Sequence, residues 1–403
     1  MIASHATRDT LIERAERLAR LRHGLYDRDF LLTWEQPDDA ITFVHEAAGL
    51  LRDIARAGLS LRLFDSGLGV SLFRDHSTRT RYAFRSACNL LGLATEELDE
   101  STSQASHGET ARETAAMISF LTEVVGVRDD MYLGEGHTGM EAMAAALDES
   151  HREGVSLARP AVINLQCDLD HPTQSLADLG HLAREFGSLD ALRGRKLVMS
   201  WAHSPSYGKP LSVPQGIIAL LPRFGVDVVL AHPEGYELEA TALDAARRFA
   251  AKSRASFSVT TDMAEAFRGA DVVYPKSWAP AWVMRERTKL LRAKDVTGLK
   301  ALEARCLAHN AQHRDWECDA AKMALTRGGE ALYMHCLPAD VTDVSCAAGE
   351  VSREVFEAHR VRTYREASHK PWVIAAMILG TRVHDPTRAL REVIVRAPPR
   401  RPA

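Results

Sequence analysis

Short apolar runs alternate with longer helix-like stretches along most of the chain, and this alternation constrains the fold more than any other feature of the sequence. Amphipathic helical patterns occur, for example, at 41–58 and 172–187. The strand-like runs are 158–166, 196–201, 226–233, 270–275 and 331–338. Strands that alternate with helices form parallel sheets with helices on both faces. We therefore predict the α/β class, with two doubly wound parallel-sheet domains.

The length of the chain also favours two domains, because 403 residues exceed the roughly 100–200 residues of a single domain. We place the first domain at 1–178, completed by a C-terminal helix at 371–395, and the second at 179–370. The basic, proline-rich end at 396–403 is expected to be disordered. A charged, largely helical segment at 284–330 forms either a solvated helical face or a substrate lid.

Composition excludes several classes of function. A net charge of −4 gives no electrostatic reason to expect a nucleic-acid partner. The N-terminal stretch lacks the apolar core of a secretory signal, and no apolar run approaches the ~20 residues of a membrane span. The six cysteines form no CxxC pair and no ligand-like pattern with histidine. We expect a reduced, cytoplasmic protein that contacts no membrane and needs neither a metal nor another cofactor.

A dense run of hydroxyl and guanidinium groups lies where a strand-like stretch ends and a helical pattern begins. Ser77, Thr78 and Thr80 supply hydroxyls, and Arg79 supplies a forked cation. A helix N-terminus adds unpaired N–H groups and the positive end of the helix dipole. The run therefore predicts a phosphate site, and the alternative is an N-cap followed by a solvated basic turn. Arg81 either faces outward or packs.

Two further motifs lie beside predicted strand ends. His171 and Gln174 flank the first turn of a helix, where they could bind a carbonyl or an amide, or could instead be a capping histidine and a surface glutamine. Cys336 and Leu337 follow a strand, and ligands of doubly wound sheets lie beyond the carboxyl ends of strands. Their backbone carbonyls could accept from an N–H donor. A nucleophilic Cys336 is the alternative, and a buried structural cysteine is favoured over it.

Together these motifs resemble the aspartate/ornithine carbamoyltransferase family. The family pattern F-x-x-x-S-T-R-T appears at 73–80, H-P-x-Q at 171–174 and H-C-L-P at 335–338. The segment "SQASHGETARETA" (103–115) looks like the family's S-Q-x-x-H-x-E-S-x-x-D-T-A segment. The resemblance spans about 75–370, and the four motifs occur in the family's order.

The resemblance implies that carbamoyl phosphate is the donor substrate. It assigns the donor's phosphate to Ser77, Thr78, Arg79, Thr80 and Arg128. It assigns the carbamoyl group to His171 and Gln174, with the carbonyls of Cys336 and Leu337 accepting from the amino group. Lys370 falls where the ornithine enzymes have a donor-site arginine, and it keeps the charge but not the bidentate fork.

The resemblance also implies a mechanism and an assembly. A neutral amine attacks the carbamoyl carbon and phosphate leaves, with no metal and no covalent intermediate. The residues implied to be catalytic are Arg79, Thr80, His171 and Gln174. Gln104 matches a loop residue that family members lend to the neighbouring subunit, which implies a homotrimer with shared sites.

The regions that bind the acceptor depart from the best-known relatives. The ornithine enzymes carry G-D-x-N-N and D-x-x-x-S-M-G segments, where this chain has 200–216 and 271–280. The loop at 203–214 and "KSW" at 276–278 resemble instead the knotted branch, which includes the N-acetylornithine and N-succinylornithine carbamoyltransferases. This likeness implies a knot in the second domain. Within that branch the chain looks most like the YgeW-type carbamoyltransferases.

For the acceptor we single out four residues. Lys276 could pair with a substrate carboxylate and Trp278 could form an apolar wall, or they could be a surface salt bridge and plain packing. Asn164 and Asp168 could line the cleft, or Asp168 could cap a helix. We expect an N-carbamoyltransferase that acts on the amine of a small amino-acid-like acceptor, or the reverse phosphorolysis of a ureido compound. The alternative is a non-catalytic sensor of carbamoyl phosphate or a similar anion.

Overall fold

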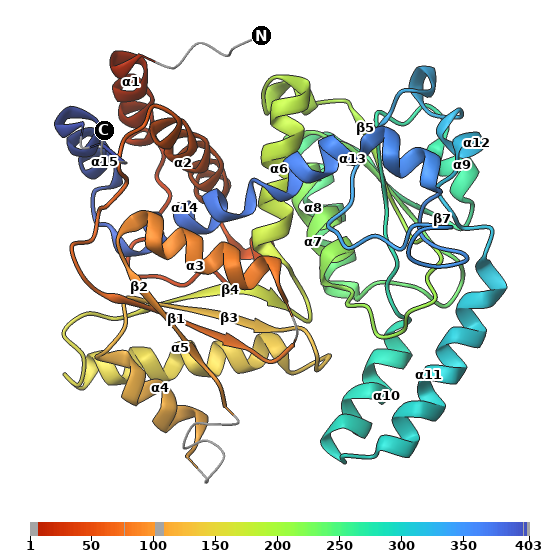
Figure 1. Cartoon of the computed structure of the whole chain (residues 1–403), viewed down its shortest axis with the longest axis horizontal. Helices are drawn as coiled ribbons and strands as arrows, with labels where there is room; N and C mark the ends of the chain where they lie inside the picture. The colour runs from red at the N-terminus through yellow and green to blue at the C-terminus, as the bar shows by residue number, and fades with distance from the viewer. Residues whose placement is uncertain (1–6, 76, 101–108, 398, 401–403) are drawn as a thin grey trace. The chain divides into compact units, whose positions relative to one another are not determined.

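The computed structural model describes residues 7–75, 77–100, 109–397 and 399–400 (Figure 1). The chain divides into two compact units. Unit 1 comprises Met1–Asp129, Gly136–Cys167 and His369–Ala403, and unit 2 comprises Asp130–Glu135 and Asp168–Ser368. Each unit contains one parallel sheet flanked by helices, so the predicted fold class is confirmed. The knot in the second domain stays a prediction.

Unit 1 is built on a four-stranded parallel sheet of order β2-β1-β3-β4. Its strands are β1 Leu68–Phe73, β2 Ala94–Leu98, β3 Val124–Asp129 and β4 Ala161–Cys167. Its α-helices are α1 Arg8–Leu18, α2 Asp38–Arg56, α3 Arg79–Leu91, α4 Ala111–Ser119, α5 Gly136–Arg152, α14 Lys370–Arg382 and α15 Pro386–Arg396. Figure 1 shows α2, α3 and α14 on one face of the sheet and α4 and α5 on the other.

Helix α3 packs closely on this sheet because small residues in the strands make room for it. A Cβ atom at Gly126 would lie 2.6 Å from Cε2 of Phe84 in α3, and one at Gly69 would lie 2.6 Å from Sγ of Cys88. The helix ends, as its sequence predicts, at Gly92, which has the left-handed φ of 103° that favours glycine. This close packing fixes α3 against the sheet, with the N-terminus of the helix just after the carboxyl end of β1.

Unit 2 is built on a five-stranded parallel sheet of order β7-β6-β5-β8-β9. Its strands are β5 Lys196–Ser200, β6 Asp227–Ala231, β7 Phe257–Thr260, β8 Val272–Pro275 and β9 Leu332–Tyr333. Its α-helices are α6 Pro172–Phe186, α7 Ser212–Leu220, α8 Ala240–Ser253, α9 Met263–Phe267, α10 Ala281–Arg292, α11 Val296–Asn310, α12 Ala320–Met323 and α13 Arg353–Ala367. Short 3₁₀ turns lie at Thr33–Glu35 in unit 1 and, in unit 2, at Asp190–Leu192, Leu221–Phe224, Ala311–His313 and Arg327–Gly329.

The strand order of each sheet reverses at one point. In unit 1 the chain moves from β1 outward to β2 and then returns to the other side of β1 at β3. In unit 2 it moves from β5 through β6 to β7 and returns beside β5 at β8. Loops diverge at such switch points, and ligands of open parallel sheets bind beyond the carboxyl ends of the strands there. The residues that follow β1, β3, β5 and β8 are therefore the first candidates for a site.

The structure differs from the strand predictions in two ways. Strands β2, β3 and β7 were not predicted, and β9 is far shorter than the predicted run at 331–338. The N–H of Met334 still donates to the carbonyl of Val273 in β8. Beyond it the N–H of His335 donates to the Glu366 side chain, and the N–H of Leu337 donates to the His335 ring. A side chain thus replaces the sheet as hydrogen-bond partner.

The C-terminal residues belong to unit 1. Arg396 ends α15, Pro399 forms an isolated bridge with Leu59, and the N–H of Arg400 donates to the carbonyl of Gly58. Residues 398 and 401–403 lie outside the described residues, and disorder at the end of the chain stays a prediction.

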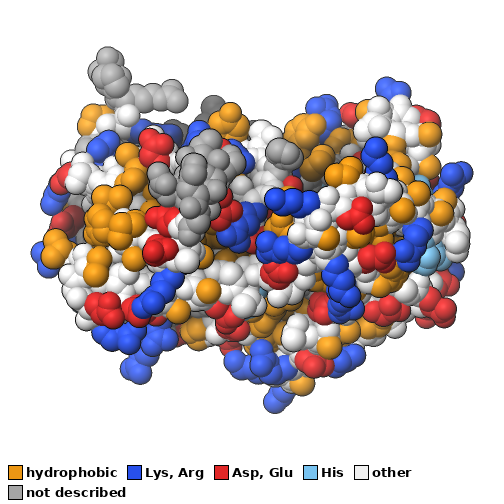
Figure 2. Space-filling model, turned by 90° about the horizontal axis from the view of Figure 1, so that it is seen from below, with side chains coloured by type: hydrophobic (Ala, Val, Ile, Leu, Met, Phe, Trp, Pro, Cys, Tyr) orange, Lys and Arg blue, Asp and Glu red, His pale blue; other side chains and the backbone are white. Residues whose placement is uncertain are grey.

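Among the helices described, none is both long and apolar enough to cross a membrane. Figure 2 shows acidic and basic side chains interspersed on the face in view.

Candidate functional site

The hydroxyl and guanidinium run lies at the switch point of unit 1. It follows β1 directly, and α3 begins within it at Arg79, with Thr78 as the residue before the first helical turn. Thr80 is buried, Ser77 is half-buried, and the other two residues of 77–80 are exposed. Helix N–H groups, hydroxyls and a guanidinium at the carboxyl edge of a sheet form a favourable environment for a small anion.

Arg81 does not extend this anion-binding set, because its guanidinium is engaged in packing. Its Nε donates to the carbonyl of Ser77 at 3.3 Å, and its guanidinium forms an ion pair with Glu97. The guanidinium carbon also lies 4.5 Å from the centre of the Phe73 ring. Of the two alternatives for Arg81, packing is therefore the one that the structure supports.

Arg128 is placed beside the run by strand register. It lies near the end of β3, where it is the parallel partner of Phe73, the last residue of β1. The neighbouring Arg74 donates its N–H to the carbonyl of Arg128 at 3.0 Å. The Arg74 side chain pairs with Glu100 at 2.7 Å and with Asp129 at 2.6 Å, and these hydrogen bonds raise the pKa of Arg74. Arg74 thus holds the carboxyl ends of β1 and β3 together next to Arg128.

The other unit 1 candidates have different surroundings. Lys370 is the first residue of α14, which packs against α2 and α3, and Lys370 is buried. Asn164 lies inside β4, where its Nδ2 donates to the carbonyl of Leu31 at 2.7 Å and approaches Sγ of Cys167 at 3.2 Å. Gln104 lies outside the described residues.

In unit 2, His171 and Gln174 lie at the N-terminus of α6. His171 precedes the first helical residue, Pro172, and its Nδ1 lies 3.3 Å from Oγ1 of Thr173. Both candidate side chains are buried, and Gln174 is only 2% exposed, which excludes a surface glutamine. Asp168, at the start of the same connection, accepts the N–H of Gly134 at 2.7 Å through its carboxylate.

The segment after β9 is held in an unusual backbone conformation. Leu337 has φ of +52°, a left-handed value that is uncommon for a residue with a branched side chain. Its N–H donates at 2.9 Å to Nδ1 of His335, which is fully buried. Nδ1 therefore accepts, which places the proton of the neutral ring on Nε2, and burial lowers the pKa of His335. Cys336, between them, is 9% exposed.

Glu350 is the centre of a buried ionic cluster beyond β8 and β9. Its carboxylate lies 3.2 Å from Nζ of Lys209 and 3.7 Å from Nζ of Lys276. Lys209 also pairs with Asp340 at 2.6 Å. Burial alone would raise the pKa of Glu350, but Lys209 and His335 outweigh it and hold that pKa well below its usual value. Glu350 is therefore the negative centre of the cluster, with the two lysine ammonium groups beside it.

Lys276 is part of this cluster and is not a surface residue. It is 6% exposed, its Nζ donates to the carbonyl of Ser277 at 2.7 Å, and burial together with Lys209 lowers the pKa of Lys276. The alternative of a surface salt bridge is thus wrong. Glu350 also accepts the N–H of Ser277 at 2.6 Å and that of Asp340 at 2.8 Å. One carboxylate therefore anchors the segments that follow β8 and β9.

Trp278 lies in the core of unit 2. Only 1% of it is exposed, its indole N–H donates to the carbonyl of Tyr236 at 2.9 Å, and its own carbonyl accepts from the indole of Trp201 at 2.9 Å. These contacts shape the loop between β8 and α10. They are the contacts expected of the packing alternative, and a role in acceptor binding stays a prediction.

Sequence reasoning missed the carboxylates and the lysine that support these motifs. They are Asp178, Lys209, Asp340, Glu350 and Glu366. They come from four separate segments, so no local pattern joins them. Lys209 lies in the loop at 203–214 that the sequence did single out, and its charge in that loop was the one available signal.

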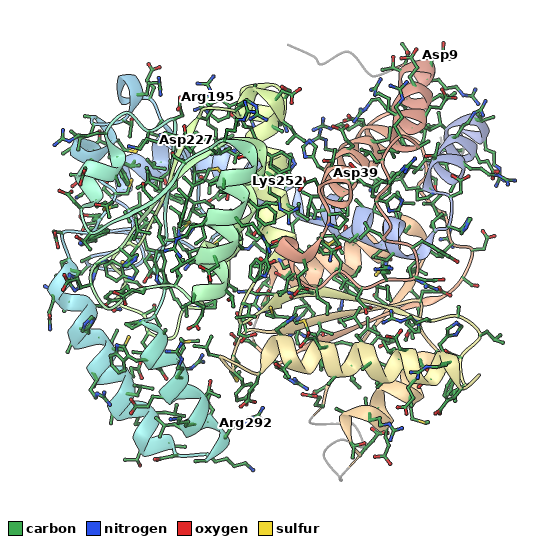
Figure 3. The ribbon with its side chains drawn as sticks, turned by 180° about the vertical axis from the view of Figure 1, so that it is seen from behind. Asp9, Asp39, Arg195, Asp227, Lys252 and Arg292 are labelled. Carbon is green, nitrogen blue, oxygen red and sulfur yellow. The ribbon has the colours of Figure 1, made fainter. Side chains whose placement is uncertain are left out.

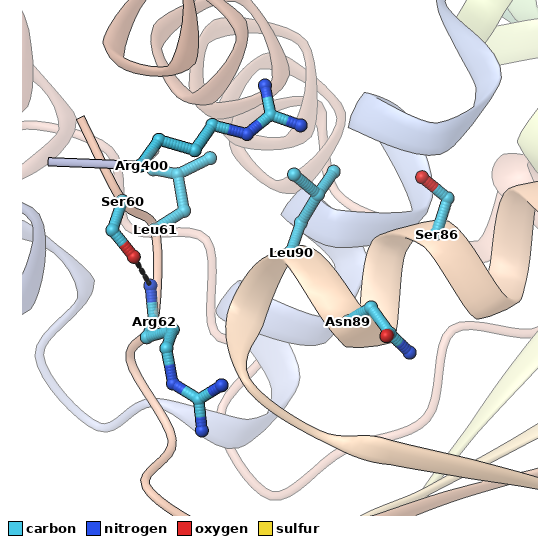
Figure 4. A pocket seen from close by; sticks show the side chains of 7 residues that line it. All are labelled: Ser60, Leu61, Arg62, Ser86, Asn89, Leu90 and Arg400. Carbon is cyan, nitrogen blue, oxygen red and sulfur yellow. Dashed lines mark hydrogen bonds between the residues drawn. The ribbon is translucent and has the colours of Figure 1, made fainter. Parts of the chain in front are cut away.

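One pocket in unit 1 lies away from the 77–80 run. It measures about 310 Å³, and its lining residues are Ser60, Leu61, Arg62, Ser86, Asn89, Leu90 and Arg400 (Figure 4). Its α3 residues come from the C-terminal half of the helix, whereas the run is at the N-terminus. The N–H of Arg62 donates to Oγ of Ser60 at 3.4 Å. The part of the chain that the structure describes contains no group of three or more side chains that could hold a metal ion.

Comparison with protein families gives two matches that together cover most of the chain. Residues 28–184 match the carbamoyl-P binding domain of aspartate/ornithine carbamoyltransferase. Residues 211–381 match the Asp/Orn binding domain of the same family. The first match contains the 77–80 run and the H-P-x-Q motif. The second contains the H-C-L-P motif and all of the ionic cluster except Lys209.

Individual proteins agree with this result. The chain is 56% identical over 388 residues to a protein of Escherichia coli K12 named "Putative carbamoyltransferase YgeW", covering 96% of this chain and 98% of that one. An ornithine carbamoyltransferase of Pyrococcus furiosus has the same fold, with a TM-score of 0.70 at 23% identity over 89% of this chain and 98% of that one. A structure of N-acetyl-L-ornithine transcarbamylase has a TM-score of 0.68 at 24% identity, over 87% of this chain and 98% of that one.

Proposed function

The chain belongs to the aspartate/ornithine carbamoyltransferase family, and from that premise we propose that it moves the carbamoyl group of carbamoyl phosphate to an amine. The acceptor is a small amino-acid-like compound, and the same site carries out the reverse phosphorolysis of its ureido product. The observation that supports this most is the position of the 77–80 run. It joins the carboxyl end of β1 to the N-terminus of α3 at the switch point, with Arg128 in register beside it.

In this proposal the phosphate of the donor is bound by a set of cations, hydroxyls and one amide. They are Ser77, Thr78, Arg79, Thr80, Arg128, Lys370 and Gln104. Charge-assisted hydrogen bonds from guanidinium and helix N–H groups are the strongest that a protein offers to phosphate. Gln104 comes from a neighbouring subunit of a homotrimer in which sites are shared.

The carbamoyl group is assigned to a second set of side chains and backbone carbonyls. His171 donates to the carbonyl oxygen together with Thr80, and Gln174 accepts from the amino group with the backbone carbonyls of Cys336 and Leu337. A neutral amine attacks the carbamoyl carbon, the C–O bond to phosphate breaks, and the proton that the amine loses passes to the leaving phosphate. Negative charge grows on the carbonyl oxygen and on the leaving phosphate, so positioning and electrostatic stabilisation supply the catalysis.

The acceptor is bound near the switch point of unit 2, where Lys276 and Trp278 follow β8. Asp168 and Asn164 are the other candidates. An acceptor carboxylate would share Lys276 with Glu350, which lies 3.7 Å away. The acceptor-binding role of Lys276 therefore requires a carboxylate able to displace the contact with the Ser277 carbonyl.

Turnover with a panel of amines tests this function. The protein is incubated with carbamoyl phosphate and each of a set of amino acids, N-acylated diamino acids and diamines. We expect phosphate release that depends on one amine, with the matching ureido product detected by mass spectrometry. Binding of carbamoyl phosphate without turnover on any amine, in either direction, would contradict the transferase and support an anion sensor.

Subunit mixing tests the shared site. Gln104→Ala and His171→Ala subunits are each expected to be inactive alone, and mixed trimers are expected to regain part of the activity because some sites then have both residues. Native mass spectrometry verifies that mixed assemblies have formed. Verified mixed trimers without activity would show that each chain contains a complete site.

A further inference from the structure

Asp178 is a fully buried carboxylate that no motif of the sequence singled out. It lies on α6, one turn after Gln174, and is 0% exposed. Nε2 of Gln174 donates to Oδ1 of Asp178 at 2.6 Å, and the Tyr274 hydroxyl donates to Oδ2 at 3.1 Å. Both oxygens of the carboxylate thus accept from side chains of unit 2.

This contact fixes which way the Gln174 carboxamide points. A carboxylate only accepts hydrogen bonds, so the amide nitrogen and not the oxygen must face Asp178. The two arms of a carboxamide diverge, and Oε1 of Gln174 therefore points away from Asp178 as an acceptor. Burial at 2% exposure leaves the side chain little freedom to turn over.

Glu366, on α13, is the second carboxyl group of this network. It is 0% exposed, and its Oε2 accepts the backbone N–H of His335 at 3.1 Å. Burial and the neighbouring charge of Asp178 raise the pKa of Glu366 well above its usual value. The raised pKa favours the protonated form of Glu366, which forms a side-chain hydrogen bond with Asp178.

The same pair orients the segment that contains the other two acceptors. Glu366 holds the N–H of His335, and the His335 ring holds the N–H of Leu337 at 2.9 Å. The N–H of Leu337 lies in one peptide plane with the carbonyl of Cys336, so the contact with the His335 ring fixes the direction of that carbonyl. Asp178 and Glu366 thus control acceptors that come from two distant parts of the sequence.

We propose that Asp178 and Glu366 are positioning residues that make the site selective for a donor with an amino group on its carbonyl carbon. The inference rests on the proposed function, because it concerns the carbamoyl group of the donor. An amino group offers two N–H donors, which match the Gln174 oxygen and the 336–337 carbonyls. A methyl group in its place offers none and leaves buried acceptors without partners. Acyl phosphates are rejected for that reason.

Two stable phosphonates test the proposal by calorimetry. Phosphonoacetamide carries the amino group, and acetonylphosphonate carries a methyl group in the same position. We expect the wild-type protein to bind phosphonoacetamide more tightly. Asp178→Asn removes the negative charge and leaves one acceptor oxygen for two donors, the Gln174 amide and the Tyr274 hydroxyl. It should lower this preference by about 3- to 10-fold, the value of one hydrogen bond. Binding of acetonylphosphonate should not change.

Variants of Glu366 provide an independent test if Asp178→Asn does not fold. Glu366→Ala removes the acceptor for His335 and should lower the preference. Glu366→Gln keeps an oxygen for that N–H and an NH2 donor for Asp178, so it should restore the preference. A matched control is Asp271→Asn, a buried aspartate of the same unit that pairs with Arg195 (Figure 3) at 3.0 Å. It should leave the preference at the wild-type value.

Different results would overturn the positioning role and the proposed function. Equal weakening of both phosphonates by Asp178→Asn or Glu366→Ala, or a wild-type protein that binds both equally, would overturn the positioning role while leaving the phosphate site intact. A wild-type protein that binds neither phosphonate would overturn the proposed function itself. A preference lost in Asp178→Asn and kept in Asp271→Asn and Glu366→Gln is the expected result.

Discussion

Replacing Glu350 by glutamine is expected to destabilise unit 2 strongly, because this carboxylate balances a buried cluster. It is 0% exposed and lies within 3.7 Å of the ammonium groups of Lys209 and Lys276. Its two oxygens also accept the N–H groups of Ser277 and Asp340, at 2.6 and 2.8 Å.

The size of the effect follows from what glutamine cannot replace. One of its two terminal atoms is an NH2 group, which would face a backbone donor, and it carries no charge. Breaking one side of a buried ion pair costs about 3–5 kcal/mol. One unsatisfied buried N–H costs about 1–3 kcal/mol more, and the two are not additive. We expect a loss of about 3–5 kcal/mol for Glu350→Gln.

Urea unfolding followed by tryptophan fluorescence measures this loss. Trp201, Trp278, Trp282 and Trp316 all lie in unit 2, so the emission reports mainly on that unit. The matched control is Glu357→Gln, which breaks an exposed pair with Arg360 at 3.0 Å on α13. Exposed pairs contribute about 0–1 kcal/mol. A Glu350→Gln variant within about 1 kcal/mol of this control would refute the cluster as a structural anchor.

Two further predictions concern the stability of each unit. Burial and Arg184 lower the pKa of His181 to about 4, so the unfolded chain, whose histidines titrate near 6.5, binds more protons between those two values. Stability should therefore fall by about 3 kcal/mol as pH falls from 7 to 4, and His181→Leu should lack this part of the decrease in urea titrations at several pH values. An unchanged pH dependence in the variant would contradict the assignment. In unit 1, Gly126→Ala should destabilise by about 1–3 kcal/mol, because its Cβ would lie 2.6 Å from Cε2 of Phe84 and 2.9 Å from Cδ1 of Leu165. In Gly139→Ala, on α5, the new Cβ would lie 3.6 Å from Nη1 of Arg74, an ordinary van der Waals distance, and the variant should be more stable by up to about 1 kcal/mol. Thermal unfolding that shows the same sign for both glycine variants would argue against the close packing of α3 on the sheet.

The sequence predicted the fold class because most central strands are continuous apolar runs. Strand β4, for example, is buried at every position, and such runs are typical of parallel sheets covered on both faces. Strands β2 and β7 were missed because they are edge strands of half-exposed residues, and β2 contains Glu96 and Glu97. Charged edge strands look like loops in a sequence. Strand β3 was missed because its apolar residues follow closely on those of helix α4, so that the sequence shows no clear boundary between helix and strand.

The candidate site could be predicted only where its chemistry is local. The 77–80 run is contiguous, and its place between a strand and a helix is visible in the sequence and borne out by β1 and α3. The network of Asp178, Glu366 and Glu350 could not be predicted, because each partner comes from a different element and only the tertiary fold brings them together. The burial of Lys276 was missed for the same reason: the carboxylate that balances its charge is more than seventy residues away.

The central claim is that the 77–80 run binds the phosphate of the donor, and calorimetry of carbamoyl phosphate with Arg79→Ala tests it most directly. Loss of one charged donor should weaken binding by about 1.5–3 kcal/mol, or roughly 10- to 100-fold. The control is Arg85→Ala on the same helix, where the guanidinium pairs with Glu97 at 3.2 Å and binding should stay within about twofold of wild type. Equal affinity of the wild-type and Arg79→Ala proteins for carbamoyl phosphate would contradict the account.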